Sequence, residues 1–184
     1  MVATPSTMAP LGSAAPAFAL AEPDGTTWTF DGIAGPRGTL VAFVCNHCPY
    51  VKHIAPHLGA LAARWRQRGL GVIGINPNPD HPDETPEQMA VNATAWRWTF
   101  PYVSDTEQSA AGDYRAACTP DFFLYDGANR LVYRGRFDAA RPGNGVPVTG
   151  DELGAAVDSV LAGEEIEVGQ LPSIGCSIKW KDRP

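Results

Sequence analysis

The sequence predicts an α/β fold with a mixed central sheet flanked by helices. Residues 40–44 and 72–75 are apolar throughout, as expected of strands that are covered on both faces of a sheet. Residues 49–68 lie between them and repeat apolar side chains at the i, i+3 and i+4 spacing of a helix. Residues 121–125 and 131–134 flank a polar turn and are typical of a hairpin. This alternation of strands and helices predicts one α/β unit.

Turn and capping signals place the remaining elements. Residues 17–20 and 27–30 are short strand candidates around a Pro-Asp-Gly turn, so we expect an added N-terminal β-hairpin. Residues 76–83 are polar and rich in proline, which predicts a solvated loop. Thr85 is a strong N-cap for a helix that runs to about residue 98. Further short elements are expected at residues 102–103 (strand), 110–116 (helix) and 151–161 (helix).

The chain is expected to divide into a flexible arm, residues 1–16, and a single domain, residues 17–184, with a docked C-terminal tail. Prolines interrupt the arm, and it lacks the positively charged start and long apolar core of a secretory signal. No run has the length of a membrane span. With a net charge of −6 and no basic patch, the sequence indicates no nucleic-acid or membrane partner. We expect a cytoplasmic protein that is a monomer or a homodimer.

Cys45 and Cys48 enclose Asn46 and His47 between the apolar strand and the following helix. Cysteines three residues apart at a helix start present both sulfur atoms on one face, close enough to bond. The N–H groups and partial positive charge of a helix N-terminus favour the thiolate, which is the attacking species in disulfide exchange. The pattern therefore predicts a dithiol redox centre. We expect Cys45 to be the more exposed, attacking thiolate, with a pKa below the usual value of about 8.5.

Two other interpretations of the pair remain open. Cys45 and Cys48 would also suit an inert core position, or a copper or zinc site completed by a histidine such as His53 or His57. A zinc site normally shows a second ligand pair, whereas Cys118 is isolated, as is Cys176. The strand–CxxC–helix context therefore favours redox chemistry, with no metal and no cofactor.

Thr119-Pro120 lies directly before the expected strand at residues 121–125. Proline removes a ladder donor and is tolerated at the first residue of a strand, and X-Pro bonds are the ones that adopt the cis form. The order strand, CxxC, helix, strand, helix, Thr-Pro, hairpin, helix resembles the thioredoxin fold. That resemblance implies a cis Thr119-Pro120 bond whose loop packs against Cys45 and Cys48.

Three stretches narrow the resemblance to a bacterial branch of the AhpC/TSA (redoxin) proteins, peroxiredoxin-like and thiol-disulfide oxidoreductase members included. They are Phe43-Val44-Cys45-Asn46-His47-Cys48-Pro49-Tyr50-Val51-Lys52, Cys118-Thr119-Pro120-Asp121-Phe122-Phe123 and Pro172-Ser173-Ile174-Gly175-Cys176-Ser177-Ile178-Lys179-Trp180. The resemblance covers the chain from about residue 17 onward. It implies a thioredoxin-like fold and thiol redox activity.

The sequence departs from the patterns of typical peroxiredoxins and of typical thioredoxins, and these differences bear on which reaction is predicted. The Pro-x-x-x-Thr/Ser-x-x-Cys pattern of typical peroxiredoxins fits neither Cys45 nor Cys48, which weakens a peroxidase interpretation. Typical thioredoxins carry a tryptophan before the first cysteine and a buried acid beneath the pair, where this chain has Val44 and Thr39. His47 resembles the arrangement in strongly oxidising disulfide catalysts, in which an imidazolium next to Cys48 stabilises the thiolate.

The leading prediction is a thiol-disulfide oxidoreductase in which Cys45 exchanges with a protein or small-molecule disulfide or thiol and Cys48 resolves the mixed disulfide. The alternative enzyme is an antioxidant thiol peroxidase. Cys118 and Cys176 are candidate additional redox residues, although at least one of them is expected to be structural, because a docked cysteine behaves as a small buried hydrophobe. His47, Thr119 and Pro120 are the expected supporting residues.

Overall fold

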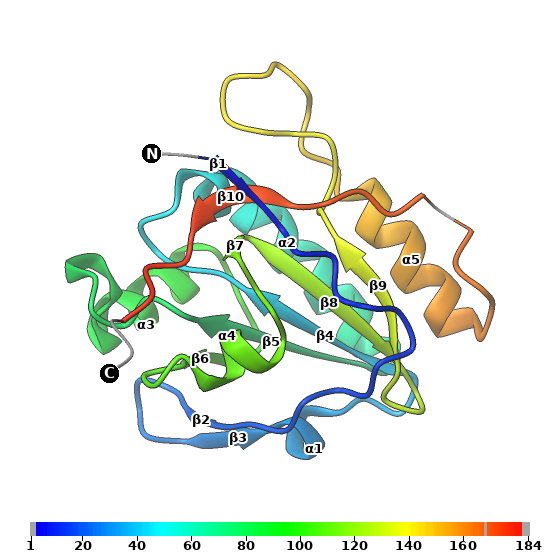
Figure 1. Ribbon diagram of the computed structural model, residues 1–184, viewed down its shortest axis with the longest axis horizontal. Coiled ribbons are helices and arrows are strands. Elements are labelled where there is room, and N and C mark those ends of the chain that lie inside the picture. Colours follow the sequence, from blue (N-terminus) through cyan, green and yellow to red (C-terminus); the bar gives the residue numbers. More distant parts are fainter. Residues whose placement is uncertain (1–2, 168, 182–184) are drawn as a thin grey trace.

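The computed structural model describes residues 3–167 and 169–181 (Figure 1). Its centre is a mixed sheet in which two groups of strands, β3-β2-β6-β5 and β4-β8-β9, meet where β5 lies beside β4. The strands of this sheet are β2 (Ala19–Ala21), β3 (Thr27–Thr29), β4 (Gly38–Phe43), β5 (Leu70–Asn76), β6 (Tyr102–Ser104), β8 (Asp121–Asp126) and β9 (Leu131–Gly135). The predicted fold class is confirmed.

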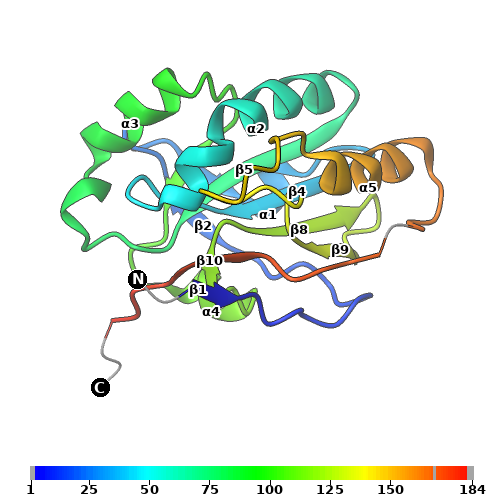
Figure 2. The same ribbon diagram turned by 90° about the horizontal axis from the view of Figure 1, so that it is seen from above.

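The middle of the sheet is apolar because it is covered on both faces. Every residue of β4 and of β5 is buried. Figure 2 shows α2 (Pro49–Gln67), α3 (Pro86–Ala95) and α5 (Asp151–Ala162) over one face of this sheet. Helix α2 turns Val51, Leu58 and other apolar side chains of its stripe toward the sheet. The chain segment that joins β4 to α2 therefore starts inside the core.

Smaller elements complete the connections. They are α1 (Phe30–Ile33), the 3-10 helix η1 (Pro82–Glu84) and α4 (Ser109–Asp113). The predicted N-terminal hairpin is present, since β2 pairs antiparallel with β3. Thr85 caps α3 as expected, but this helix ends at Ala95, where Trp96 is the C-cap and Arg97 takes a positive φ of 57°. Within the described residues, no helix combines the length and apolarity that a membrane crossing requires.

A second, three-stranded sheet lies on the other face and joins the two ends of the described chain (Figures 1 and 2). Strand β10 (Ile174–Ser177) stands between β1 (Ala3–Pro5) and β7 (Cys118–Thr119), antiparallel to both. The first residues were expected to belong to a flexible arm, but residues 3–5 form a paired strand. The pairing gives partners to backbone groups that β10 would otherwise leave open at a sheet edge.

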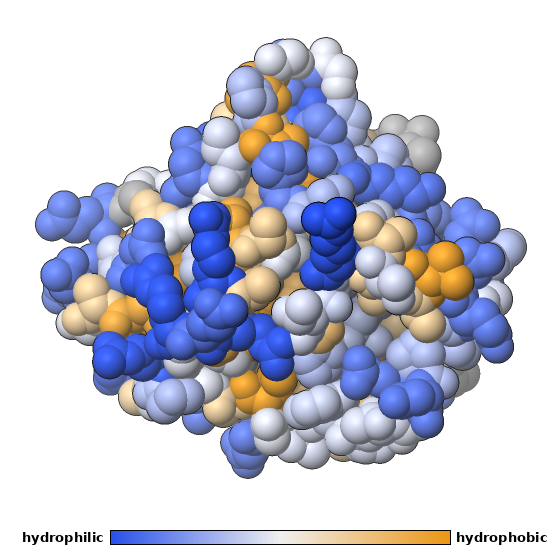
Figure 3. Space-filling model, turned by 180° about the vertical axis from the view of Figure 1, so that it is seen from behind, coloured by the Kyte–Doolittle hydropathy of each residue, from blue (hydrophilic) through white to orange (hydrophobic). Residues whose placement is uncertain are grey.

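The surface in Figure 3 is mostly polar, with apolar side chains in small, separate patches. The exposed large apolar residues are distributed over different elements rather than gathered in one patch; they are Leu11, Val91, Val146, Leu171 and Trp180. Single exposed apolar residues are normal on a protein surface.

Candidate active site

Cys45 and Cys48 sit where β4 gives way to α2. The N–H of Val44 donates to Ile75 O (2.9 Å), so the chain is still held to β5 one residue before Cys45. Cys48 is the N-cap of α2 and Pro49 is its first residue, which suits proline because that position needs no hydrogen-bond donor. Both cysteines are 0 % exposed. Our expectation that Cys45 is the more exposed of the two was wrong, because the segment is still enclosed by the core at that point.

The Thr119-Pro120 loop faces both sulfur atoms. The peptide bond between these residues is cis, as predicted. Thr119 Oγ1 lies 3.1 Å from Cys45 Sγ, and Thr119 O lies 3.0 Å from Cys48 Sγ. The predicted packing of this loop on the cysteine pair is therefore confirmed.

A buried carboxylate, Glu84, holds the two residues between the cysteines. Its Oε2 accepts a hydrogen bond from the backbone N–H of Asn46 (2.8 Å), and its Oε1 accepts one from the backbone N–H of His47 (2.8 Å). The Asn76 side chain donates a further hydrogen bond to Oε2 (2.9 Å). Glu84 is 2 % exposed, and these donors compensate for burying its charge. The carboxylate thus fixes the backbone of the CxxC turn.

His47 is oriented by the same carboxylate. Its Nδ1 lies 2.6 Å from Glu84 Oε1, and because a carboxylate only accepts, Nδ1 carries the hydrogen. The opposite ring nitrogen, Nε2, lies 4.0 Å from Cys45 Sγ, and the ring stacks on His81 with centroids 3.8 Å apart. His47 was expected to lie close to Cys45, and this geometry confirms it. The result is a Glu84–His47–Cys45 arrangement in which each group positions the next.

The two cysteines have opposite acidities. Burial raises the pKa of Cys45 well above its usual value, and the shared hydrogen bond with Cys48 and the negative charge of Glu84 raise it further. Hydrogen bonds from Cys45, from Cys176 and from the backbone N–H of Val51 lower the pKa of Cys48 to about 5, against its burial. The Thr119 carbonyl, 3.0 Å from Cys48 Sγ, acts in the opposite direction, because it can accept a hydrogen bond only from the protonated thiol. Our prediction of a lowered pKa at Cys45 is thus wrong; the thiolate belongs to Cys48.

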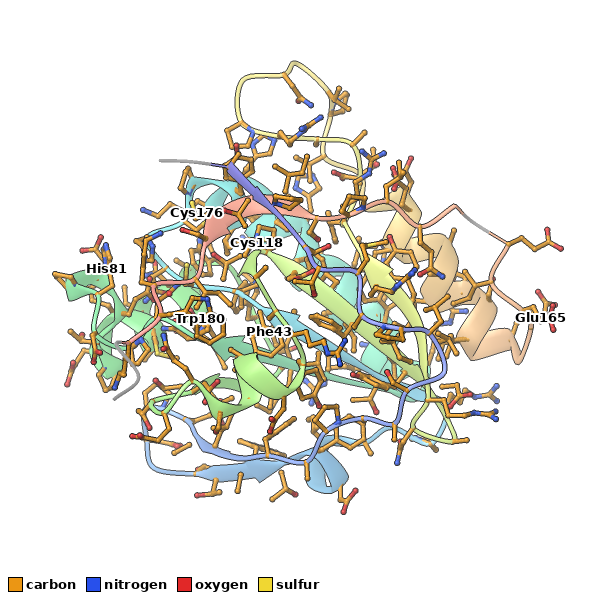
Figure 4. The ribbon with its side chains drawn as sticks, viewed as in Figure 1. Phe43, His81, Cys118, Glu165, Cys176 and Trp180 are labelled. Carbon is orange, nitrogen blue, oxygen red and sulfur yellow. The ribbon has the colours of Figure 1, made fainter. Side chains whose placement is uncertain are left out.

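The two remaining cysteines lie next to each other on the second sheet (Figure 4). Cys176 on β10 brings its Sγ within 3.1 Å of Cys48 Sγ. Cys118 on β7 is also buried, but its Sγ contacts Pro120 O at 3.6 Å. Burial raises the pKa of Cys118 above its usual range. Burial also raises the pKa of Cys176, to about 12. Cys176 therefore lies against the Cys45–Cys48 pair, whereas Cys118 is packed in the core with its sulfur against the Pro120 carbonyl.

Potential metal ligands gather at the same place but are already engaged. Ligand atoms of Cys45, His47 and Glu84 lie within 4.8 Å of one another. Both oxygens of Glu84, however, accept hydrogen bonds from backbone and side-chain donors, and Nδ1 of His47 is bound to Glu84. His53 and His57, the ligands that we considered from the sequence, are not part of this group. The donor set suits an oriented thiol–imidazole pair better than a metal ion.

Sequence reasoning missed two buried acids, Glu84 and Asp121. Glu84 follows a segment that we expected to be solvated, and Asp121 directly follows Pro120. Burial raises the pKa of Asp121 well above its usual range. One signal could have indicated Glu84: it follows β5, and functional groups collect at the carboxyl ends of neighbouring strands in α/β sheets. Nothing in the local pattern distinguished Asp121 from an ordinary residue at a strand start.

Beside the Thr119-Pro120 loop the surface is hollowed. A small pocket there is lined by Tyr50 from the first turn of α2, by Pro120, by Ile174 of β10, and by Phe137 and Arg141. The cysteines themselves do not line it. The pocket therefore lies next to the buried sulfurs rather than opening onto them.

This sheet, its helices and the cis-proline loop facing two cysteines define a thioredoxin-like redox protein. The chain belongs to the AhpC/TSA family, whose model matches residues 11–134. It is an oxidoreductase with a redox thiol function.

Solved structures agree with the assignment of the fold. An uncharacterized conserved protein from Geobacillus kaustophilus is 43% identical, with a TM-score of 0.96, over 100% of this chain and 99% of that chain. A hypothetical protein from Sinorhizobium meliloti 1021 is 46% identical, with a TM-score of 0.95, over 98% and 100%. A putative protein disulfide isomerase from Bacteroides thetaiotaomicron shares the fold at 16% identity, with a TM-score of 0.65, over 90% and 96%. No curated protein matches the chain.

Proposed function

We propose that the protein is a thiol-disulfide oxidoreductase that donates the disulfide formed by Cys45 and Cys48. The observation that carries this proposal is the pair of sulfurs at the N-terminus of α2, joined by a shared hydrogen bond that lowers the pKa of Cys48 to about 5. A thiolate stabilised in this way favours the reduced form of the pair. A disulfide whose reduced form is stabilised is a strong oxidant.

The acidity of Cys48 decides which sulfur a substrate attacks. A substrate thiolate attacks Cys45 Sγ, the Cys45–Cys48 bond breaks, and the electron pair stays on Cys48. A thiol of low pKa leaves faster, so attack at Cys45 is favoured over attack at Cys48. The product is a mixed disulfide between the substrate and Cys45, with Cys48 as a thiolate.

The second half of the reaction returns Cys45 to its thiol form. A second substrate thiolate attacks the substrate sulfur, forms the substrate disulfide and expels Cys45. The raised pKa of Cys45 means that the departing sulfur takes up a proton. His47 Nε2, 4.0 Å from Cys45 Sγ, is placed to deliver this proton, and Glu84 holds the ring in that position through Nδ1. Two substrate thiols become a disulfide while the protein disulfide becomes a dithiol.

A single-turnover assay tests this proposal. Oxidised protein is mixed with a reduced dithiol peptide under anaerobic conditions, and formation of the peptide disulfide is followed. We expect one peptide disulfide per chain, and none from Cys48→Ser. Cys118→Ser is the matched cysteine control and should react as the wild type does. The proposal fails if the wild-type protein reacts no faster than Cys48→Ser.

The complete burial of both sulfurs favours one second candidate, a thiol peroxidase that admits only a small oxidant. Hydrogen peroxide and a proton would convert the Cys48 thiolate to a sulfenic acid with release of water. Cys45 would then attack that sulfur, releasing a second water and forming the same disulfide. Peroxide consumption driven by a dithiol reductant, absent in Cys48→Ser, would support this reaction. The dithiol-peptide assay without peroxide tests the leading reaction separately.

A further inference from the structure

Three sulfur atoms, rather than two, meet at the N-terminus of α2. Cys48 Sγ lies 3.1 Å from Cys176 Sγ, although 128 positions separate the two residues in the chain. This distance lies within the separation of about 3–3.5 Å that a near-attack arrangement requires. Closing this gap to the disulfide bond length of about 2.05 Å requires a movement of about 1 Å. Cys48 is therefore in reach of a second sulfur partner besides Cys45.

The strand that carries Cys176 is held closely to the active site. Cys176 is the register partner of Thr119, the residue that contacts both Cys45 and Cys48. The neighbouring Gly175 allows this approach, because a Cβ atom there would collide with Thr119 O. On its other side β10 is paired with β1, which keeps it in place. The short sulfur–sulfur distance is thus a consequence of strand pairing at the cis-proline loop.

We propose that Cys176 is a third redox cysteine, which exchanges with the Cys45–Cys48 disulfide to form a Cys48–Cys176 disulfide. This inference rests on the proposed function, because it starts from the disulfide formed there. Cys176 Sγ attacks Cys48 Sγ, the Cys48–Cys176 bond forms and the Cys45–Cys48 bond breaks. The released Cys45 sulfur takes up the proton that Cys176 loses. The number of disulfides is unchanged, so the step consumes no oxidant or reductant.

The exchange moves the disulfide away from Cys45, the residue that the substrate attacks. Cys45 becomes a thiol again beside His47, while the disulfide moves to the second sheet. The new bond also ties β10 covalently to the start of α2. Cys118 takes no part, since its sulfur contacts the Pro120 carbonyl.

Peptide mapping of the wild-type chain tests the proposal without any substitution. Protein oxidised with diamide is quenched in acid, its remaining thiols are alkylated, and it is digested with trypsin. A Cys48–Cys176 disulfide joins the peptides of residues 38–52 and 137–179, whereas a Cys45–Cys48 disulfide lies within residues 38–52. We expect both forms, together accounting for one disulfide per chain. Finding only the internal form would overturn the relay while leaving the proposed function intact; finding neither would contradict both.

A variant without Cys45 isolates the second bond. Cys45→Ser/Cys118→Ser retains only Cys48 and Cys176, and we expect oxidation to remove both thiols and to lower its intact mass by two hydrogen atoms. The matched control adds Cys176→Ser and should lose no such mass. A folded Cys45→Ser/Cys118→Ser variant, checked by circular dichroism, that forms no internal disulfide under conditions that fully oxidise the wild type would refute the relay.

Discussion

Cys45 and Cys48 lie three residues apart, are equally buried and contact the same threonine, yet their sulfurs are in opposite electrostatic environments. Cys45 faces the carboxylate of Glu84 and the ring of His47, and its pKa is raised well above its usual value. Cys48 caps α2 and receives hydrogen bonds from a backbone N–H and from two other sulfurs, which lower its pKa to about 5. Proximity to a helix start does not by itself make a thiol acidic; the donors must point at that sulfur.

This difference gives the two residues different tasks. The acidic Cys48 is the sulfur that leaves easily, and the protonated Cys45 is the sulfur that is attacked and must regain its proton. Glu84 orients His47 toward Cys45. The first turn of α2 and Cys176 donate hydrogen bonds that lower the pKa of Cys48. Substitutions on one side should therefore leave the other side largely intact.

The largest expected effect is on the thiolate content of the reduced protein at neutral pH. Cys45→Ser should retain most of the thiolate, because the serine hydroxyl can donate to Cys48 in place of the Cys45 thiol while Val51 and Cys176 still donate. Cys48→Ser should lower the ultraviolet thiolate absorbance about 100-fold, since a thiol with a pKa of 9 or more is about 1 % ionised at neutral pH. Cys118→Ser, whose thiol is protonated, serves as the control. Loss of the signal in Cys45→Ser together with its retention in Cys48→Ser would exchange the two assignments.

His47→Ala should slow single-turnover exchange by about 100-fold, the lower end of what a positioned proton donor contributes. The thiolate absorbance of Cys48 should not change, because His47 faces Cys45. His57→Ala, at an exposed position of α2, is the matched control. Equal rates in the two variants would show that His47 transfers no proton.

Glu84→Gln should lower the free energy of unfolding by about 2 kcal/mol, because an amide cannot accept every hydrogen bond that the buried carboxylate accepts. The same change should lower the pKa of Cys45, since the charge that raises it is gone. Glu87→Gln, at an exposed position of α3, is the control for both measurements. Denaturant unfolding and thiol titration that leave the Glu84 variant unchanged would contradict its assigned role.

The sequence was sufficient where the signals were local. Three signals come from neighbouring residues: the apolar strand before Cys45, the apolar stripe of the helix after Cys48, and the proline before β8. The structure contains all three features. Together with the resemblance to the thioredoxin fold, these local patterns led to the correct fold and to the cis bond after Thr119. They also placed both cysteines at the correct end of α2.

The remaining parts of the site depend on residues that are distant in sequence. Residues 76–83 were expected to be solvated, but Asn76 and Asn78 are buried: Asn76 donates to Glu84, and Asn78 accepts from the backbone of Lys179. Polar composition does not reveal such partners, because they come from the 3-10 helix η1 and from the tail. The acidity of Cys48 likewise depends on Cys176, which only strand pairing brings near.

The most direct test of the account is the titration of each cysteine in the reduced wild-type protein, followed by NMR of ¹³Cβ-labelled cysteine with assignments from the single Ser variants. We predict that Cys48 titrates near pH 5 and that Cys45 stays protonated well above neutral pH. The Cys48 thiolate is then present at neutral pH and is lost only as the pH falls through about 5. A Cys45 that titrates at the lower pH, with Cys48 protonated at neutral pH, would contradict the account.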